Sequence, residues 1–574
     1  MQIIKSLSIL LAASFVTASG DVGLTFPLRH RDVLPVLKLP YGKWRAYSYN
    51  SEADVYTFRN IRYAAPPIGD LRWATPAPPE FVAGIQDGSY GHNCIPGPIP
   101  PEFDSPIFEN ITKNANEDCL FLDIYVPGKA LKSHRPSVPV VVWIHGGAYV
   151  TGSKDQGISI GYFDGTSLIQ RAEQNLIVVS INYRLGAFGF LAGEPLRGEG
   201  NGTCTTRTSA VFNAGLHDQR AALKWVQSYI HLLGGDANNV SAWGQSAGAG
   251  SIMHHLIAKG GTLDPLFKTA ALYSPGFGTS ADEAKTEAQF EAFAGAVGCP
   301  VKGTDALRCL RAANTTVLKE ANVNIFAGAA NPVPDGEYIQ NVALLEYSQG
   351  NLSVVAFAHE EAELNQAGNT WPHLNSLIVS HVLDEGALFV PPQIPPNFIE
   401  SYISGLLPPN STAGTNRMVS LYESIYANST TTELASVVSR DMIFTCNIYA
   451  AVQQYNNSWA FQYSYIDGVT NGTHGSDVLA IWYNPTLQGF EEPLFEQYQR
   501  YLTTFAHTGD PNKPRGHGNE SEFWPRVDSK GEMLSEVLDL TNEGFEIIQD
   551  EQVRRDVCGA WIEVLGEAIE SERS

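Results

Sequence analysis

Residues 240–250 read VSAWGQSAGAG and place Ser246 at the centre of a Gly-x-Ser-x-Gly pattern. A β-type run precedes the serine, and small residues that can begin a helix follow it. A sharp strand-to-helix turn strains its central residue, and Gly244 and Gly248 leave room for the backbones to cross. Such a turn would expose the Ser246 hydroxyl, with the amides from Ala247 onward pointing at an oxygen that gains negative charge during acyl transfer. The pattern indicates a serine hydrolase.

The composition is typical of a globular protein with a large core, because 44% of the 574 residues are hydrophobic and 17% are charged. This length fits two or three domains, or one elaborated α/β enzyme. Lys and Arg number 37 against 60 Asp and Glu, so the formal net charge is -23. A surface of this charge repels phosphate backbones and anionic lipid head groups, and we expect no nucleic-acid partner.

Residues 1–20 have the pattern of a secretory signal peptide: Lys5 precedes an apolar run over residues 7–16, and small residues follow. The run is too short to span about 30 Å of hydrocarbon, so we expect no membrane anchor. The C-terminal sequence SERS is neither an ER-retention signal nor an apolar GPI tail, which favours export to the extracellular space. Asn-x-Ser/Thr glycosylation sites, which fit a secreted protein, begin at Asn110, Asn201, Asn239, Asn314, Asn351, Asn410, Asn428, Asn456, Asn471 and Asn519.

Seven cysteines in an exported chain indicate disulfide bonds with one thiol left over. The alternative is a metal site, but no Cys-x-x-Cys or His/Cys cluster has zinc spacing, so we expect no metal. Spacing alone does not prove connectivity, and Cys204, in a polar insert, is the candidate for the odd thiol. The expected pairs are Cys94 with Cys119, Cys299 with Cys309, and Cys446 with Cys558.

Short β-type runs alternate with helical segments, which predicts an α/β fold. Residues 139–144 (PVVVWI) and 176–181 (LIVVSI) are continuous apolar runs, as in strands that are covered on both faces. Residues 216–235 carry apolar side chains at helical spacing and end in two glycines. Beyond about residue 280 we expect cap helices interleaved with the last sheet strands. No internal repeat or long linker is visible, so one catalytic domain over residues 21–574 is the simplest partition.

Several motifs, in order, resemble the type-B carboxylesterase and lipase family, to which the cholinesterases also belong. They are WGQSAGA, the upstream HGGAYVTGS (145–153), NEDCLFLDIYVP (116–127) and VSHVLDEGALF (379–389). The similarity extends from NIRYAAPPIGDLRW at residue 60 to WPRVD at residue 524, nearly the whole mature chain. The resemblance implies an α/β-hydrolase fold: a large, mostly parallel central sheet flanked by helices, with cap helices and a disulfide-closed flap loop.

A serine hydroxyl needs a base and a carboxylate that orients the base, and in this fold the order is serine, acid, histidine. The resemblance assigns the acid to Glu385, in a Asp-Glu-Gly triplet after an apolar run. Glu361 also follows an apolar run but lacks the Gly and the Phe of the family pattern. The base is assigned to His474, which matches the His-Gly segment in NGTHGSDVLAIW. The other downstream histidines, His507 and His517, are expected at the surface.

An oxyanion hole needs backbone amides that point into a water-poor pocket, and the Gly-rich stretch 145–153 can provide them. By resemblance the donors are the amides of Gly147, Ala148 and Ala247, with Gly146 allowing a close approach. The family usually has a third glycine at position 148. Alanine keeps the N–H but narrows the allowed backbone dihedrals.

The resemblance implies two-step hydrolysis of a small-molecule or lipid ester through an acyl-enzyme, with no cofactor. Choline esters are not expected, because loop 94–119 holds no Trp for a cation–π contact and Gln245 replaces the usual acid before the serine.

A lipase acting on long-chain acylglycerols or sterol esters is one alternative. The apolar residues of loop 94–119 could cover an acyl tunnel or simply pack under the disulfide. A non-catalytic, cholinesterase-like binding protein is an alternative of another class, and a protease is a weaker one. The apolar loop residues are Ile99, Phe103, Ile107 and Phe108.

Overall fold

The structure is a computed structural model. It describes residues 34–97, 112, 114–132, 137–155, 163–200, 209–278, 283–326, 330–349, 374–391, 394–395, 397–409, 411–513 and 522–573. Outside these ranges lie the expected signal peptide and the residues Ile99, Phe103, Ile107, Phe108, Cys204, Glu361 and His517.

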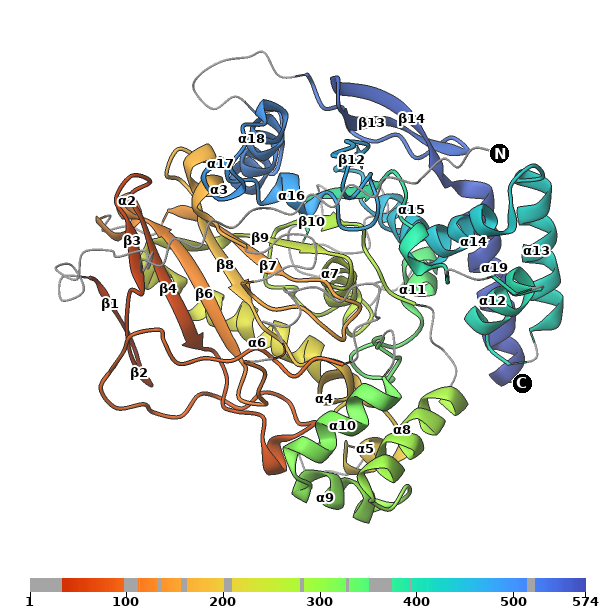
Figure 1. Ribbon diagram of the computed structural model, residues 1–574, viewed down its shortest axis with the longest axis horizontal. Coiled ribbons are helices and arrows are strands. Elements are labelled where there is room, and N and C mark those ends of the chain that lie inside the picture. Colours follow the sequence, from red (N-terminus) through yellow and green to blue (C-terminus); the bar gives the residue numbers. More distant parts are fainter. Residues whose placement is uncertain are drawn as a thin grey trace, which may run out of the picture.

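An eleven-stranded sheet crosses the molecule, in the order β14-β13-β12-β11-β10-β9-β7-β8-β6-β4-β3 (Figure 1). The strands from β8 to β13 along this order pair in parallel, and antiparallel strands complete both edges. This arrangement confirms the expected α/β-hydrolase fold class. The strands of this sheet are β3 Ser48–Asn50, β4 Val55–Arg62, β6 Phe121–Pro127, β7 Val138–Ile144, β8 Ile177–Ile181, β9 Gly235–Gln245, β10 Thr269–Tyr273, β11 Ser376–Val382, β12 Ser458–Tyr463, β13 Met533–Thr541 and β14 Gly544–Arg554. A second, three-stranded sheet consists of β1 Val36–Leu39, β2 Gly42–Arg45 and β5 Ile85–Gln86.

The central strands are apolar throughout because both sheet faces are covered. Alternate side chains of β7 enter two separate apolar clusters: Val142 and Ile144 face one, and Val141 and Trp143 face the other. On the first side lie α6 and α7, and on the second lie α3, α16 and α18. The bounds of these helices are α3 Thr166–Arg171, α6 Ala214–Tyr229, α7 Ala247–Ile257, α16 Val478–Ile481 and α18 Pro493–Thr508.

Most cap helices come from the stretch after residue 280 and lie around one side of the sheet (Figure 1). The strands β11 to β14 are interleaved with them in sequence, which confirms the expected organisation of this half. These helices are α8 Glu283–Val297, α9 Thr304–Ala312, α10 Thr315–Ile325, α11 Ala343–Gln349, α12 Phe398–Leu406, α13 Thr412–Ile425, α14 Thr431–Arg440, α15 Cys446–Gln454 and α19 Arg555–Arg573. The shorter helices among the described residues are α2 Gly128–Lys132, α4 Gly186–Phe190, α5 Glu194–Gly200, α17 Pro485–Gln488, η2 Gly69–Leu71, η4 Ile230–Leu233, η5 Ala387–Phe389 and the π-helical η6 Asp441–Thr445.

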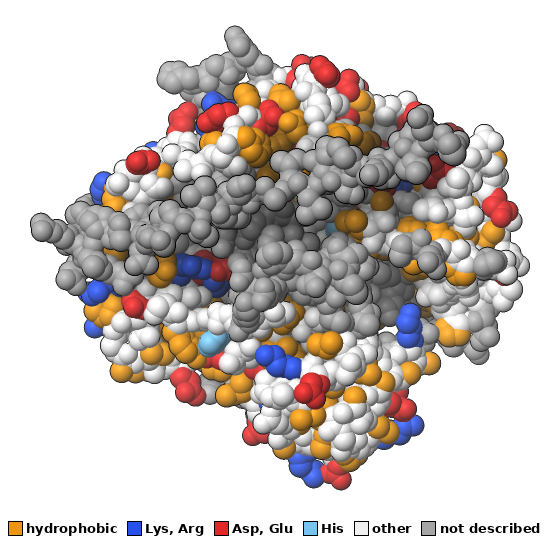
Figure 2. Space-filling model, in the orientation of Figure 1, with side chains coloured by type: hydrophobic (Ala, Val, Ile, Leu, Met, Phe, Trp, Pro, Cys, Tyr) orange, Lys and Arg blue, Asp and Glu red, His pale blue; other side chains and the backbone are white. Residues whose placement is uncertain are grey.

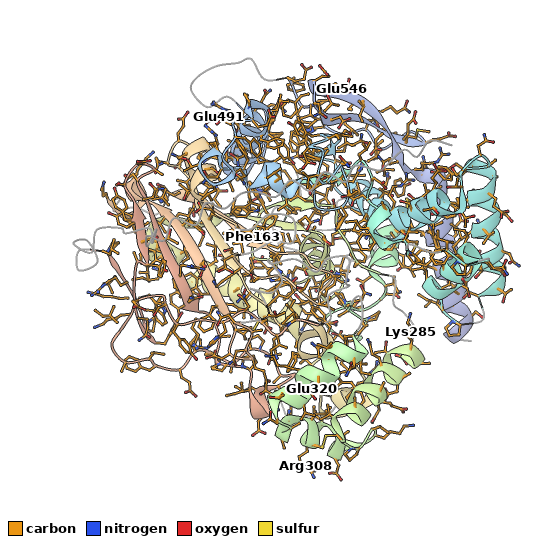
Figure 3. All side chains as sticks on the ribbon, in the orientation of Figure 1. Phe163, Lys285, Arg308, Glu320, Glu491 and Glu546 are labelled. Atoms are coloured by element: carbon orange, nitrogen blue, oxygen red, sulfur yellow. A yellow bond between two sulfur atoms is a disulfide. The ribbon has the colours of Figure 1, made fainter. Side chains whose placement is uncertain are left out.

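Large aromatic side chains fill the second cluster. The ring of Phe163 lies 5.3 Å from that of Trp143 and 5.2 Å from that of Trp482, and Figure 3 shows Phe163 well inside the molecule. By contrast, the labelled Arg308 and Glu546 lie at its outer edge (Figure 3). Figure 2 likewise shows acidic and basic side chains interspersed with apolar ones over the described surface. Few of the described charged side chains are buried, and buried ones such as Arg72 with Glu117 and Arg184 with Asp218 form ion pairs.

Three disulfide bonds join Cys94 to Cys119, Cys299 to Cys309 and Cys446 to Cys558, with S–S distances of 2.00, 1.96 and 2.04 Å. The last of these links α15 to α19 across a sequence separation of 112 residues. It therefore ties the C-terminal helix to the helix that precedes β12.

Candidate active site

Ser246 occupies a strained turn between β9 and α7, with φ 55° and ψ -125°. A Cβ on Gly244 would lie 2.6 Å from the carbonyl carbon of Gly248, and a Cβ on Gly248 would lie 2.0 Å from the carbonyl oxygen of Ile144. Only glycine therefore fits either position. The Ser246 N–H donates to the carbonyl of Tyr273 (2.8 Å), which holds the turn against the end of β10. The structure thus has the strand–turn–helix context that the Gly-x-Ser-x-Gly pattern predicts. The expected exposure of Ser246 was wrong, because the surrounding loops leave this residue only 8% exposed.

Glu385 and His474 are in direct contact at the same edge of the sheet. His474 Nδ1 donates to Glu385 Oε2 at 2.5 Å, and Glu385 Oε1 accepts the N–H of Val382 at 2.9 Å. The Glu385 side chain is fully buried. Burial raises the pKa of Glu385, but the charge and hydrogen bond of His474, together with the hydrogen bond from the Val382 N–H, outweigh burial and hold that pKa below its usual value. Glu385 is therefore ionised at neutral pH.

The loops that carry these two residues are joined by backbone pairing. Asp384 N–H donates to the carbonyl of Gly472 at 2.8 Å, and Asp384 forms a parallel bridge with Thr473. Gly472 has a φ of 72°, a left-handed conformation that favours glycine. Because β9, β10, β11 and β12 are consecutive parallel strands, their carboxyl ends bring Ser246, Glu385 and the His474 loop to one edge of the sheet.

The free side of the His474 ring faces the turn that carries Ser246. Its Nε2 lies 3.3 Å from the side-chain amide nitrogen of Gln245, the residue before Ser246. With Nδ1–H committed to Glu385, Nε2 is the nitrogen that accepts a proton. Phe444 packs on the His474 ring, with ring centroids 4.4 Å apart. Phe444 also lies against Gly276, where an added Cβ would be 2.9 Å from the Phe444 ring. The N–H of Gly276 donates to the Ser246 carbonyl. Apolar rings thus enclose the imidazole beside the serine.

The expected oxyanion loop lies directly against the serine. A Cβ on Gly146 would lie 2.9 Å from the Ser246 Cβ, so this glycine is needed for the close approach. Gly147 has a φ of 112° and Ala148 a φ of 52°, both in the left-handed region. This conformation costs alanine about 1–2 kcal/mol, as expected from the narrower range of backbone dihedrals that alanine allows. Ala247 begins α7, next to Ser246.

One nearby acid was not singled out by the sequence. Asp477 is fully buried at the start of α16, three residues after His474. Burial, with a further contribution from the charge of Glu385, raises the pKa of Asp477 to about 8. Asp477 is therefore largely protonated at neutral pH and leaves the negative charge on Glu385. Asp477 could have been found from the sequence, because it lies within the motif that contains His474. No sequence motif marks Phe444.

His507 lies far from this edge. It is part-buried in the last turn of α18, and its carbonyl accepts a bond from the side chain of Asn239 in β9. Asn239 precedes Ser246 by seven residues, roughly 23 Å along a strand. This places His507 towards the opposite end of β9, although it is less exposed than the sequence suggested.

Two further properties concern the described residues as a whole. Within the described ranges, no group of three or more His, Cys, Asp or Glu side chains is arranged to hold a metal ion. None of the helices in this part of the chain is long and apolar enough to cross a membrane.

The parallel sheet, the strained serine turn and the acid–histidine contact at the strand ends define an α/β-hydrolase. The chain belongs to the carboxylesterase family, whose model matches residues 34–555, and it is a carboxylic-ester hydrolase. It is 41% identical to a secreted lipase of Arthroderma benhamiae over 93% of both chains, and 29% identical to carboxylesterase patB of Aspergillus clavatus over 92% of this chain and 96% of that one. The crystal structure of Aspergillus niger EstA is similar, with a TM-score of 0.74 and 25% identity over 93% of this chain and 99% of that one.

Proposed function

We propose that the protein hydrolyses carboxylic esters through an acyl-enzyme formed on Ser246. The supporting observation is the Glu385–His474 bond of 2.5 Å, with His474 Nε2 turned toward the residue that precedes Ser246. In this arrangement Nε2 takes the proton of the Ser246 hydroxyl while its oxygen attacks the ester carbonyl. Glu385 stabilises the imidazolium that forms.

The negative charge of the tetrahedral intermediate falls on the carbonyl oxygen, which the amides of Gly147, Ala148 and Ala247 bind. His474 then gives its proton to the departing alkoxide, which leaves the acyl group on Ser246. Water attacks this acyl-enzyme with the same histidine as base, and the acid and free serine are released. No step calls for a cofactor.

The test is Ser246→Ala with p-nitrophenyl butyrate as substrate. Loss of the nucleophile lowers kcat by about 10⁶-fold, because the histidine and acid have nothing to activate. A variant that folds and keeps more than a hundredth of the activity would rule out Ser246 as the nucleophile.

A lipase is the second candidate, and the relative named as a secreted lipase supports it. A lipase would hydrolyse an emulsified long-chain triacylglycerol faster than a soluble short-chain ester, and its rate would rise once the substrate exceeds its solubility. An esterase would show the reverse order and no such rise. Gln245 stands where the family usually has an acid, and this supports uncharged esters over choline esters, for a lipase and for an esterase alike.

We also propose that residues 1–20 direct export and that residues 21–574 form one catalytic domain. The name of the secreted relative and the match of the family model over residues 34–555 support both. Mass spectrometry of the protein from the culture medium, before and after glycosidase treatment, would show a mature chain that begins near residue 20 and carries N-glycans. A full-length chain retained in the cell would contradict this.

A further inference from the structure

A buried histidine–aspartate pair adjoins the turn that carries Glu385. His381 is the sixth residue of β11, and its Nε2 lies 2.8 Å from Asp550 Oδ2 on β14. The two side chains are 2% and 1% exposed. The other carboxylate oxygen of Asp550 accepts the N–H groups of Gln552 (2.8 Å) and Val553 (3.3 Å). The pair therefore connects the C-terminal hairpin β13–β14 to the strand that ends at the catalytic acid.

The contacts of His381 show that its ring is charged. Nδ1 lies 3.0 Å from the carbonyl oxygen of Val382, which has no proton to donate, while Nε2 faces the carboxylate of Asp550. Both nitrogens can donate only in the imidazolium form. Burial lowers the pKa of His381, but the charge and hydrogen bond of Asp550, helped by Glu385, outweigh it and raise that pKa to about 9.

Two bonds from this region fix the backbone between β11 and Glu385. Val382 is held through its carbonyl by His381, and its N–H in turn binds Glu385 Oε1. The side chain of Gln552, also on β14, donates to the carbonyl of Leu383 at 3.1 Å. The side chains of His381 and Gln552 thus set the positions of Val382 and Leu383. The N–H of Val382 in turn holds a carboxylate oxygen of Glu385.

The charges around His381 give it a second effect. Carboxyl groups face it from four segments: Glu385 after β11, Asp477 after the His474 loop, Asp539 on β13 and Asp550 on β14. While His474 is neutral, Glu385 is a buried anion, and a buried charge is costly unless a counter-charge lies near. The His381 imidazolium, although paired with Asp550, also interacts with the charge of Glu385 and so lowers this cost.

We propose that His381 and Asp550 form a charged positioning pair that holds the Glu385 carboxylate in place for His474. Both residues act through Val382 and through charge and touch no reacting atom. The proposal rests on the proposed role of Glu385 in the triad. It makes the hairpin β13–β14 part of the support of the active site.

The first test is the alkaline pH dependence of kcat. His381 keeps its charge below pH 9 and loses it as the pH rises through about 9, when one ring nitrogen can no longer donate. For p-nitrophenyl butyrate, corrected for spontaneous hydrolysis, kcat should fall through a limb near pH 9 with little change in KM. In His381→Gln this limb should disappear, and kcat at pH 7.5 should be about 10-fold lower than in the native protein.

Asp550→Asn should behave differently, because the ring remains but its counter-charge is lost. The alkaline limb should move at least one unit toward lower pH. Asp539→Asn is the matched control: Asp539 is a buried carboxyl of the same hairpin that acts on His381 through its charge alone, because its hydrogen bonds go to Ser464 and Gln462. Its limb should move less than half as far as that of Asp550→Asn, and its kcat should stay within twofold of the native value.

A limb that persists unchanged in His381→Gln, or an Asp550→Asn variant that matches Asp539→Asn, would overturn the proposal. If His381→Gln fails to fold, the comparison of Asp550→Asn with Asp539→Asn decides alone.

A measurement without turnover separates this proposal from the proposed function. Because the pKa of His381 is raised from its usual 6.5 to about 9, the stability that its charge contributes is complete below about pH 6.5 and is lost by about pH 9. The Tm difference between Ser246→Ala and Ser246→Ala/His381→Gln should therefore shrink across that range. A shrinking difference together with full activity of Ser246→Ala would retain the charged pair and reject the triad. A constant difference would reject the charged pair.

Discussion

At the scale of single residues, the site depends on glycines that allow the backbones to cross at Ser246. Gly248→Ala places a Cβ 2.0 Å from the carbonyl oxygen of Ile144, a backbone atom that cannot move aside without shifting β7. Overpacking of this kind costs about 3 kcal/mol, and we expect a matching loss of stability in denaturant unfolding together with loss of activity.

Gly295→Ala is the control for this substitution. Gly295 lies in α8, where the nearest atom to an added Cβ is 3.8 Å away. Alanine has the higher helix propensity, so this variant should gain about 0.5–1 kcal/mol and keep its activity. Equal effects of the two substitutions would show that the turn at Ser246 is not packed as described.

The carboxylate of Glu385 is the second feature that a single substitution isolates. Glu385→Gln keeps the shape but removes the charge that stabilises the imidazolium, and the amide can present its NH₂ to Nδ1 and favour the wrong tautomer. We expect kcat to fall about 10³–10⁴-fold with a smaller change in KM. The neighbouring Asp384→Asn is the control, since the side chain of Asp384 is exposed and bonds to Ser436; its kcat should change less than twofold. Similar losses in both variants would mean that the turn, and not this charge, is what catalysis requires.

At the scale of elements, the disulfide between α15 and α19 should stabilise the fold more than the disulfide that spans ten residues. Closing a longer loop removes more entropy from the unfolded chain, so separations of 112 and 10 residues predict a difference of about 2 kcal/mol. Denaturant unfolding of Cys446→Ser/Cys558→Ser and of Cys299→Ser/Cys309→Ser measures it. A larger loss from the second pair would contradict this loop-length argument.

Local sequence patterns predicted the elements whose environment repeats along the chain. The apolar runs at 139–144 and 176–181 correspond to β7 and β8. The helical spacing after residue 216 corresponds to α6, which ends at Tyr229, and to the 3-10 helix η4, which follows it and ends before Gly234 (φ 85°). A strand that is buried on both faces leaves a continuous apolar run in the sequence, and an amphipathic helix leaves a helical period, so these elements could be recognised.

The positioning pair and Phe444 left no such period. His381 and Asp550 are 169 residues apart in sequence, and they meet although β12 and β13 lie between β11 and β14 in the sheet. Phe444 reaches His474 from a π-helical turn, η6, which has no sequence signature. Strand order and register depend on contacts distant in sequence, which a local pattern does not contain.

At the scale of the whole molecule, the sheet order brings together residues that the chain keeps more than 200 positions apart. The motifs at Ser246, Glu385 and His474 could be named from the sequence because each belongs to a family pattern. Their meeting at one edge follows from the parallel order of β9, β10, β11 and β12. The acid–histidine distance of 2.5 Å is the result that the sequence could not provide.

The proposed mechanism requires that Ser246 is reactive and that the other serines are not. Labelling the purified protein with a fluorophosphonate, followed by peptide mapping by mass spectrometry, tests this directly. We predict a single adduct, on Ser246, formed in step with the loss of esterase activity. An adduct on another residue, or full inactivation without any adduct on Ser246, would contradict the account.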